Sequence, residues 1–158
     1  DYPMDKTVHG LFSERASERP DATALVFEGK EMGYGELERR SNQLARRIRS
    51  QYLARTGSAM GPDTLVPLFL ERGLEMVVSI LAVMKAGGAY VPIDPGYPHE
   101  RVGYILSDTG CEIVLSQQSL MEDPETPLAM EGTIAVDLSG ELYSEEDHGP
   151  LDPVSGPR

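Results

Sequence analysis

Two kinds of apolar segment alternate along the first 116 residues of the chain. One kind places apolar residues three and four positions apart, which is typical of a helix with one buried face. The other is a short apolar run, which is typical of a buried strand. Gly and Pro residues, which end helices and form turns, separate the segments. Alternation of this kind predicts an α/β fold: a layered, mostly parallel sheet with flanking helices.

Four helices and six strands follow from these patterns. The helices are expected at residues 7–18, 33–52, 73–86 and 99–107, and the strands at 23–27, 31–32, 65–70, 89–91, 112–115 and 133–136. The third helix is apolar nearly all round, so we expect it to be covered on every side. Gly87 follows it, where a left-handed cap is expected. Pro67 has no N–H to donate to a sheet, which predicts an edge strand or a bulge.

The second helix is expected to have one buried face and one solvated face. The expected buried residues are Tyr34, Leu37, Leu44, Ala45, Ile48 and Tyr52. The expected solvated residues are Glu38, Arg39, Arg40, Arg46, Arg47 and Arg49. A run of Arg could suggest phosphate binding, but the acidic residues mixed with it favour a solvated face.

Charge narrows the classes of partner. The formal net charge is -12, and residues 117–158 hold ten acidic residues against one basic residue, Arg158. This balance argues against nucleic acid and against an anionic membrane surface as partners. The longest apolar stretch, residues 76–84, is far shorter than the roughly 20 residues that cross a bilayer. Cys111 is the single cysteine, which fits a reducing cytosol and a buried, unreactive thiol.

Side chains that could carry chemistry are scattered. The candidates weighed are His9, His99 and His148 as metal ligands, Asp94 and Asp108 as a carboxylate pair, and Ser116 and Ser119 as nucleophiles. The histidines lack ligand spacing, and the serines lack a G-x-S-x-G context. The two aspartates are expected to shape a turn and a helix end. Gly87 and Gly88 follow a helix instead of preceding one, so they are not expected to hold phosphate.

A first motif lies at the start of the second helix. It reads Met32-Gly33-Tyr34-Gly35-Glu36-Leu37, followed by Ser41-Asn42-Gln43-Leu44-Ala45. It resembles the Leu-Thr-Tyr-x-Glu-Leu and Asn-x-Leu-Ala motifs of non-ribosomal peptide synthetase adenylation domains. Gly33 stands where this family usually has Thr. As a helix cap Gly loses only a few tenths of a kcal/mol, and Glu36 is expected to support the helix start.

A second motif is more specific. Residues 83–95, Val-Met-Lys-Ala-Gly-Gly-Ala-Tyr-Val-Pro-Ile-Asp-Pro, resemble the second core motif of the same family, and the likeness continues through Tyr97-Pro98, Arg101 and Asp108-Thr109-Gly110. Lys85 is the last charged residue before the helix end, where a cation favours the helix dipole. The lead-in at residues 5–25 is similar to the usual entry from a condensation domain. The resemblance covers residues 3–138.

The resemblance implies a parent enzyme that binds ATP, Mg²⁺ and an amino acid. It would form an aminoacyl adenylate and pass the acyl group to phosphopantetheine on a carrier domain. The family's phosphate loop, substrate pocket, hinge and catalytic Lys come later than Arg158. No residue of this chain matches a catalytic, cofactor-binding or metal position, so the segment alone is expected to be inactive. The chain opens without Met and is expected to belong to a longer, cytoplasmic protein.

The resemblance also implies a division of the chain. Residues 1–6 would be a linker, 7–138 the N-terminal segment of the adenylation domain, and 139–158 an acidic linker rich in Pro and Gly. Arg158 falls where some family members carry an inserted methyltransferase, which leaves that arrangement open.

Three alternative functions stay open at this point. They are an acyl or aryl adenylate-forming ligase, a non-catalytic half-domain acting as an interaction module, and a generic nucleotide-binding α/β domain. A half-domain should expose apolar surface where the rest of its sheet belongs.

Overall fold

The structure is a computed structural model that describes residues 18, 22–126, 128, 132–139 and 143. The strands are β1 (Thr23–Phe27), β2 (Lys30–Gly33), β3 (Leu65–Phe69), β4 (Ala89–Ile93), β5 (Val114–Ser116) and β6 (Thr133–Ala135). The helices are α2 (Tyr34–Thr56), α3 (Leu74–Ala86), α4 (His99–Thr109) and α5 (Gln118–Met121). The alternation predicted from the sequence is therefore confirmed from β1 onward. The helix expected at residues 7–18 lies outside the described residues, apart from Glu18.

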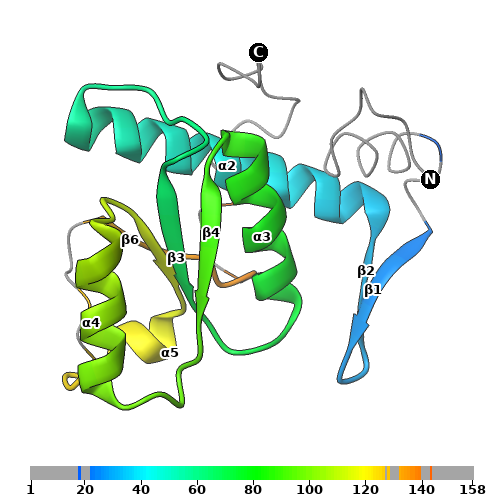
Figure 1. The fold of residues 1–158 in the computed structure, drawn as a ribbon. Coiled ribbons are helices and arrows are strands. Elements are labelled where there is room, and N and C mark those ends of the chain that lie inside the picture. The colour runs from blue at the N-terminus through cyan, green and yellow to red at the C-terminus, as the bar shows by residue number, and fades with distance from the viewer. Residues whose placement is uncertain (1–17, 19–21, 127, 129–131, 140–142, 144–158) are drawn as a thin grey trace, which may run out of the picture.

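Four parallel strands form the main sheet in the order β4-β3-β5-β6. The chain moves from β3 to β4 through α3, and then returns past β3 to β5 through α4. Because crossovers between parallel strands are right-handed, opposite directions of travel put α3 and α4 on opposite faces of the sheet. Figure 1 shows α4 on one face, with α3 and α2 on the other. The predicted α/β fold is confirmed.

Each face of the sheet has its own core. Val66, Leu68 and Leu115 belong to the larger core, together with residues of α2 and α3. Phe69 and Val114 belong to the smaller core, with Val102 of α4. Alternate residues of β3 and β5 thus enter opposite cores, as the two-residue period of a strand requires. None of the thirteen residues of α3 is exposed, so the predicted cover on every side is confirmed.

The prediction for Pro67 is wrong. Its strand β3 lies between β4 and β5, and the register of β3 with β4 runs without a bulge. The short strand β5 pairs with β3 only at Leu68 and Phe69. Pro67 therefore has β4 alone as a paired neighbour, and its missing N–H is tolerated as it would be at an edge.

Two helices differ from the sequence prediction: α2 is longer than expected, and α5 was not expected. α2 continues four residues beyond Tyr52, to Thr56, and ends at Gly57, which has a φ of 75°. Between Tyr52 and Gly57 no residue breaks a helix, because Gly is the first to adopt the left-handed cap easily. The short helix α5 follows β5, in a stretch whose sequence shows no helical pattern. Its four residues are too few to show one.

The turn at Gly87 and Gly88 sets β4 beside β3. Gly87 takes the left-handed conformation, with a φ of 98°, and its N–H donates to Val83 O and Met84 O. The predicted helix cap is confirmed. Gly88 lies so close to the preceding loop that an added Cβ would stand 2.9 Å from Thr64 O and 2.8 Å from the Met60 side chain. The next residue, Ala89, donates its N–H to the same Thr64 O.

Gly88→Ala is expected to destabilise the chain by about 1–3 kcal/mol, because the new methyl group must displace a backbone carbonyl. Chemical denaturation of the purified chain measures this. Gly61→Ala is the matched control, since a Cβ at Gly61 meets no atom within 4 Å. It should change the free energy of unfolding by less than about 0.5 kcal/mol. Equal stability of the two variants would contradict the close approach at Gly88.

Candidate functional site

In open α/β sheets, ligands bind beyond the carboxyl ends of the strands, where the direction of travel reverses. Here that point lies between β3 and β5, since the chain leaves β3 toward β4 and comes back to β5 on the other side. This edge of the sheet is therefore the first candidate for a site.

At this edge of the sheet, side chains of the same chain bind backbone N–H and C=O groups. Gln117 Oε1 accepts the Glu71 N–H at 2.8 Å, which ties the end of β5 to the end of β3. Buried Ser116 donates its Oγ–H to Phe69 O at 2.8 Å. The Gln118 N–H donates to Asp137 Oδ2 at 2.8 Å, which adds the end of β6. The backbone N–H groups of Glu71 and Gln118 are thus already bound within the chain.

A buried lysine of α3, Lys85, lies between α3 and α2. The Lys85 ammonium donates to Glu38 Oε1 at 2.7 Å, Ser41 Oγ at 2.7 Å and Asn42 Oδ1 at 2.8 Å. Its side chain is only 5% exposed. Three acceptors match the three N–H bonds of an ammonium group, whereas a neutral amine has two. We call Lys85, Glu38, Ser41 and Asn42 the Lys85 cluster.

Two opposing effects act on the charge of this lysine. Burial lowers the pKa of Lys85 below its usual value, because it disfavours the charged form. The hydrogen bond and the negative charge of Glu38 oppose this fall in pKa. The sequence correctly placed Lys85 at the end of its helix, yet its main contacts are with the neighbouring helix.

The predicted solvated face of α2 is partly wrong. Arg39 and Arg47 are exposed as expected. Glu38 instead binds Lys85, and Arg49 donates from Nε and Nη2 to Ala86 O and Lys85 O at 3.4 and 3.2 Å. The last carbonyls of a helix lack partners within that helix, so Arg49 satisfies two from α3. These charges face inward because α3, which sequence periodicity alone does not locate, packs beside them.

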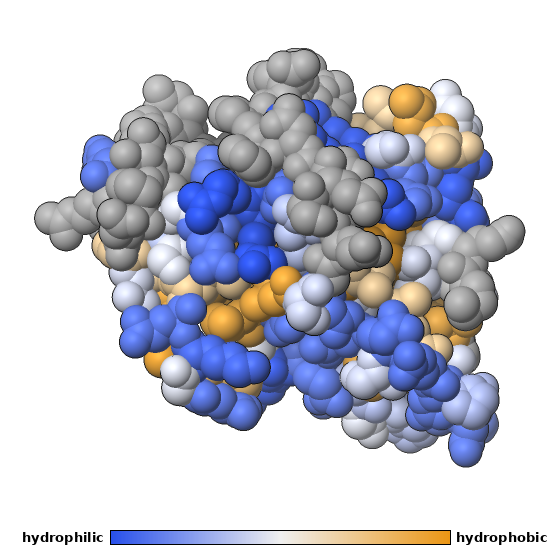
Figure 2. Space-filling view, turned by 180° about the vertical axis from the view of Figure 1, so that it is seen from behind, coloured by the Kyte–Doolittle hydropathy of each residue, from blue (hydrophilic) through white to orange (hydrophobic). Residues whose placement is uncertain are grey.

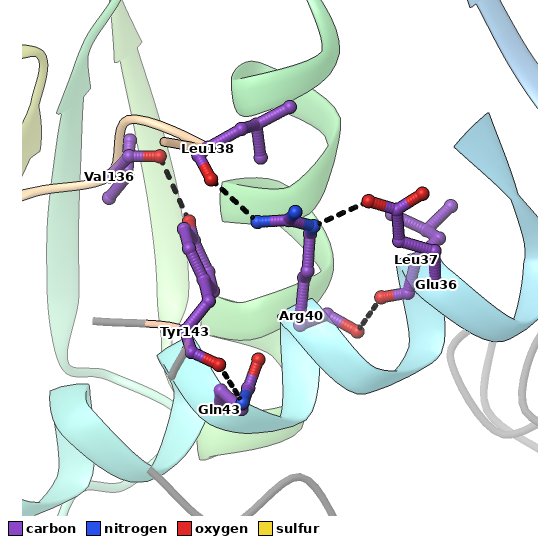
Figure 3. Close-up of polar contacts among 8 residues, drawn as sticks. Glu36, Leu37, Arg40, Gln43, Val136, Leu138 and Tyr143 are labelled. Carbon is purple, nitrogen blue, oxygen red and sulfur yellow. Dashed lines mark hydrogen bonds and ion pairs between the residues drawn. The ribbon is translucent and has the colours of Figure 1, made fainter. Parts of the chain in front are cut away.

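Arg40 is also bound within the molecule, and Figure 3 shows its surroundings. Its Nε donates to Glu36 Oε2 at 2.8 Å, and its Nη1 donates to Leu138 O at 2.9 Å. The guanidinium lies over the Tyr143 ring, 4.8 Å from the ring centre. The Glu36 carboxylate therefore binds Arg40. No side-chain hydrogen bond caps the start of α2, where Glu36 was expected to act.

The other sequence candidates are kept apart by the fold. Asp94 Oδ1 accepts the Gly96 N–H at 2.8 Å and shapes a turn, as predicted. Asp108 is exposed on α4. Cys111 lines a cavity of about 300 Å³ at the amino ends of β3 and β5, together with Tyr52, Asp63, Thr64, Leu65, Thr109, Gly110 and Glu112. The Cys111 side chain is half-buried, where a buried thiol was expected, and its Sγ lies 3.8 Å from Leu106 O.

No metal cluster and no membrane span occur in the part of the chain that the structure describes. His, Cys, Asp and Glu side chains do not gather there in groups of three. Each described helix is too short or too polar to cross a bilayer. Of the three histidines only His99 is described, and it is exposed at the start of α4. Ser119 is exposed on α5.

Comparison with known proteins agrees with the two motifs. The profile of the family described as AMP-binding enzyme matches residues 12–155. The chain belongs to this family. Tyrocidine synthase 3 from Brevibacillus parabrevis is 47% identical over 120 residues, which make up 76% of this chain and 2% of that protein. Bacitracin synthase 3 from Bacillus licheniformis is 39% identical over 155 residues, 98% of this chain and 2% of that protein.

Solved structures of adenylating proteins share the fold. The non-ribosomal peptide synthetase FmoA3, in its AMPPNP-bound form, matches 97% of the present chain with a TM-score of 0.81 and 29% identity. The match spans 15% of the FmoA3 chain. The N-terminal subdomain of NpsA from Klebsiella oxytoca, in complex with 3-hydroxyanthranilyl-AMSN, gives a TM-score of 0.69 at 25% identity, over 94% of this chain and 35% of that one. The chain is thus a partial adenylation-domain segment.

Lys85→Met is expected to destabilise the chain by about 3 kcal/mol. It leaves the Glu38 carboxylate, Ser41 and Asn42 without their shared donor, and breaking a buried ion pair from one side is strongly destabilising. Thermal and urea denaturation measure the loss. Lys30→Met, at an exposed lysine of β2, is the matched control and should stay within about 0.5 kcal/mol of wild type. A Lys85→Met variant as stable as wild type would contradict the role of the Lys85 cluster.

Proposed function

We propose that this chain supplies framework to an amino-acid adenylation domain of a non-ribosomal peptide synthetase. The parent reaction joins an amino acid and ATP into aminoacyl-AMP and pyrophosphate, and the acyl group then passes to a carrier domain. The observation that carries the proposal is the packing of the two motifs against each other. Lys85 of the second motif binds Ser41 and Asn42 of the first.

The comparisons favour an amino acid as the substrate class. The relatives at 38–48% identity include tyrocidine, bacitracin, mycosubtilin and gramicidin synthases. One FmoA3 structure is in its alpha-methyl-L-serine-AMP bound form. NpsA, in complex with 3-hydroxybenzoyl-AMSN, is more distant, at 22% identity. An acyl or aryl acid is therefore the second candidate.

The segment's own part in this reaction is structural. At its carboxyl edge, hydrogen bonds donated by Ser116 and accepted by Gln117 and Asp137 join the ends of three strands. We infer that the family's catalytic positions lie outside this chain. ATP-dependent chemistry would then rely on polypeptide beyond this segment, with Mg²⁺ bound there and phosphopantetheine on the carrier domain. We extend the proposal to a cytoplasmic protein with a condensation domain in cis.

The division of the chain is part of the same proposal. Residues 7–138 would form the adenylation segment, with linkers at 1–6 and 139–158. Most of the second linker lies outside the described residues, whereas Tyr143, which belongs to it, packs against Arg40. A methyltransferase inserted after this segment is a further arrangement, which the downstream coding sequence decides.

ATP–pyrophosphate exchange tests the proposal. The complete protein that contains residues 1–158 should exchange label with at least one amino acid and with no aryl acid. The 158-residue chain alone should show no exchange. Exchange with aryl acids only would favour the second candidate. Exchange by the isolated chain would contradict the framework role.

A further inference from the structure

Two described residues after β6, Leu138 and Tyr143, contact α2. Leu138 O accepts from Arg40, and Gln43 Nε2 donates to Tyr143 O. The Tyr143 hydroxyl donates to Val136 O at 2.9 Å, which joins Tyr143 to the residue that follows β6. We call the described residues of this stretch, 136–139 and 143, the return loop. Figure 3 shows Arg40 between Glu36 of α2 and the Leu138 carbonyl of this loop.

Arg40 is the residue that joins the two parts. Its guanidinium makes three different contacts at once: an ion pair with Glu36, a hydrogen bond to Leu138 O, and a stacking contact with the Tyr143 ring. A planar guanidinium suits this combination, because it donates in its plane and stacks with its face. A lysine at this position would offer one compact charge and could not make all three contacts.

Tyr143 is held at its hydroxyl and at its backbone carbonyl. Burial raises the pKa of its phenol, and Glu75 and Asp137 raise it further, while the Arg40 charge opposes them. The phenol is therefore neutral at physiological pH and keeps the proton that it donates to Val136 O. Because Gln43 binds its carbonyl, Tyr143 is held against α2 by its backbone as well as by its ring.

We propose that Arg40 is a positioning residue for adenylation, which fixes through the return loop the place where the rest of the domain continues from this framework. The inference rests on the proposed function, in which the nucleotide-binding polypeptide follows this segment. The match spans 15% of the FmoA3 chain, so most of that protein lies outside the part that resembles this segment. A shift of about 1 Å in a supporting element can lower the rate about 100-fold while leaving the reacting groups intact.

The test uses ATP–pyrophosphate exchange by the complete protein, at a temperature where circular dichroism shows every variant folded. Arg40→Ala should lower kcat about tenfold or more and leave the KM for the amino acid within about twofold, because the substrate contacts lie elsewhere. Tyr143→Leu, which removes the ring, should behave alike. Tyr143→Phe keeps the ring and should retain most of the rate, and Arg40→Lys should fall between wild type and Arg40→Ala.

Arg39→Ala is the matched control, since Arg39 is the neighbouring arginine of α2 and is exposed. It should keep the wild-type kcat. If Arg40→Ala and Tyr143→Leu melt at lower temperature but keep full kcat while folded, the contacts serve stability alone and the positioning role is wrong. If the wild-type protein shows no exchange with any amino acid, the proposed function fails and the positioning role fails with it.

Discussion

The Lys85 ammonium, buried among three side-chain oxygens of α2, is the interaction on which the rest of the fold depends. A buried charge tolerates little displacement, because each lost acceptor leaves an N–H bond without a partner in a poorly solvated place. Glu38, Ser41 and Asn42 must therefore stay on the side of α2 that faces α3. The cluster specifies one rotation and one height of α2 against α3, where apolar contacts alone would permit several.

The position of α3 then determines the start of β4. Lys85 lies two residues before the left-handed cap at Gly87, and Gly88 brings the chain to within hydrogen-bond reach of Thr64 O. From there β4 runs in register with β3 for five residues. Arg49 binds the carbonyls of Lys85 and Ala86, so a second residue of α2 holds the same helix end. Residues of the two motifs thus hold α2, α3 and the start of β4 together as one packed unit.

The surface agrees with a framework whose apolar residues are mostly covered. Large exposed apolar side chains among the described residues are Val26, Leu53, Tyr90 and Tyr104, and they come from four different elements. Seen from behind, the drawn apolar side chains form patches among hydrophilic ones (Figure 2). The apolar third helix is covered, as its sequence pattern predicted.

How far the sequence predicts this structure depends on the range of each interaction. The α/β order and the cap at Gly87 rest on local patterns, and both are confirmed. The central position of β3 was not predicted. Pro67 shows only that one N–H is missing, whereas the reason this is tolerated is that β5 is too short to pair with it. The contacts of three charged side chains of α2 were not predicted for a related reason. Glu38, Arg40 and Arg49 look solvated until α3 and the return loop are placed beside them. The available signal was Lys85 itself, a charge within an otherwise apolar helix that needs partners from elsewhere.

A double-mutant cycle between Lys85 and Glu38 tests the central claim most directly. The free energies of unfolding of Lys85→Met, Glu38→Gln and the double variant are compared with that of the wild-type chain. We expect a coupling energy of about 1–3 kcal/mol, since residues of one buried network do not act additively. A coupling energy below about 0.3 kcal/mol would mean that the two side chains act independently, and that the buried ammonium does not fix how α2 packs against α3.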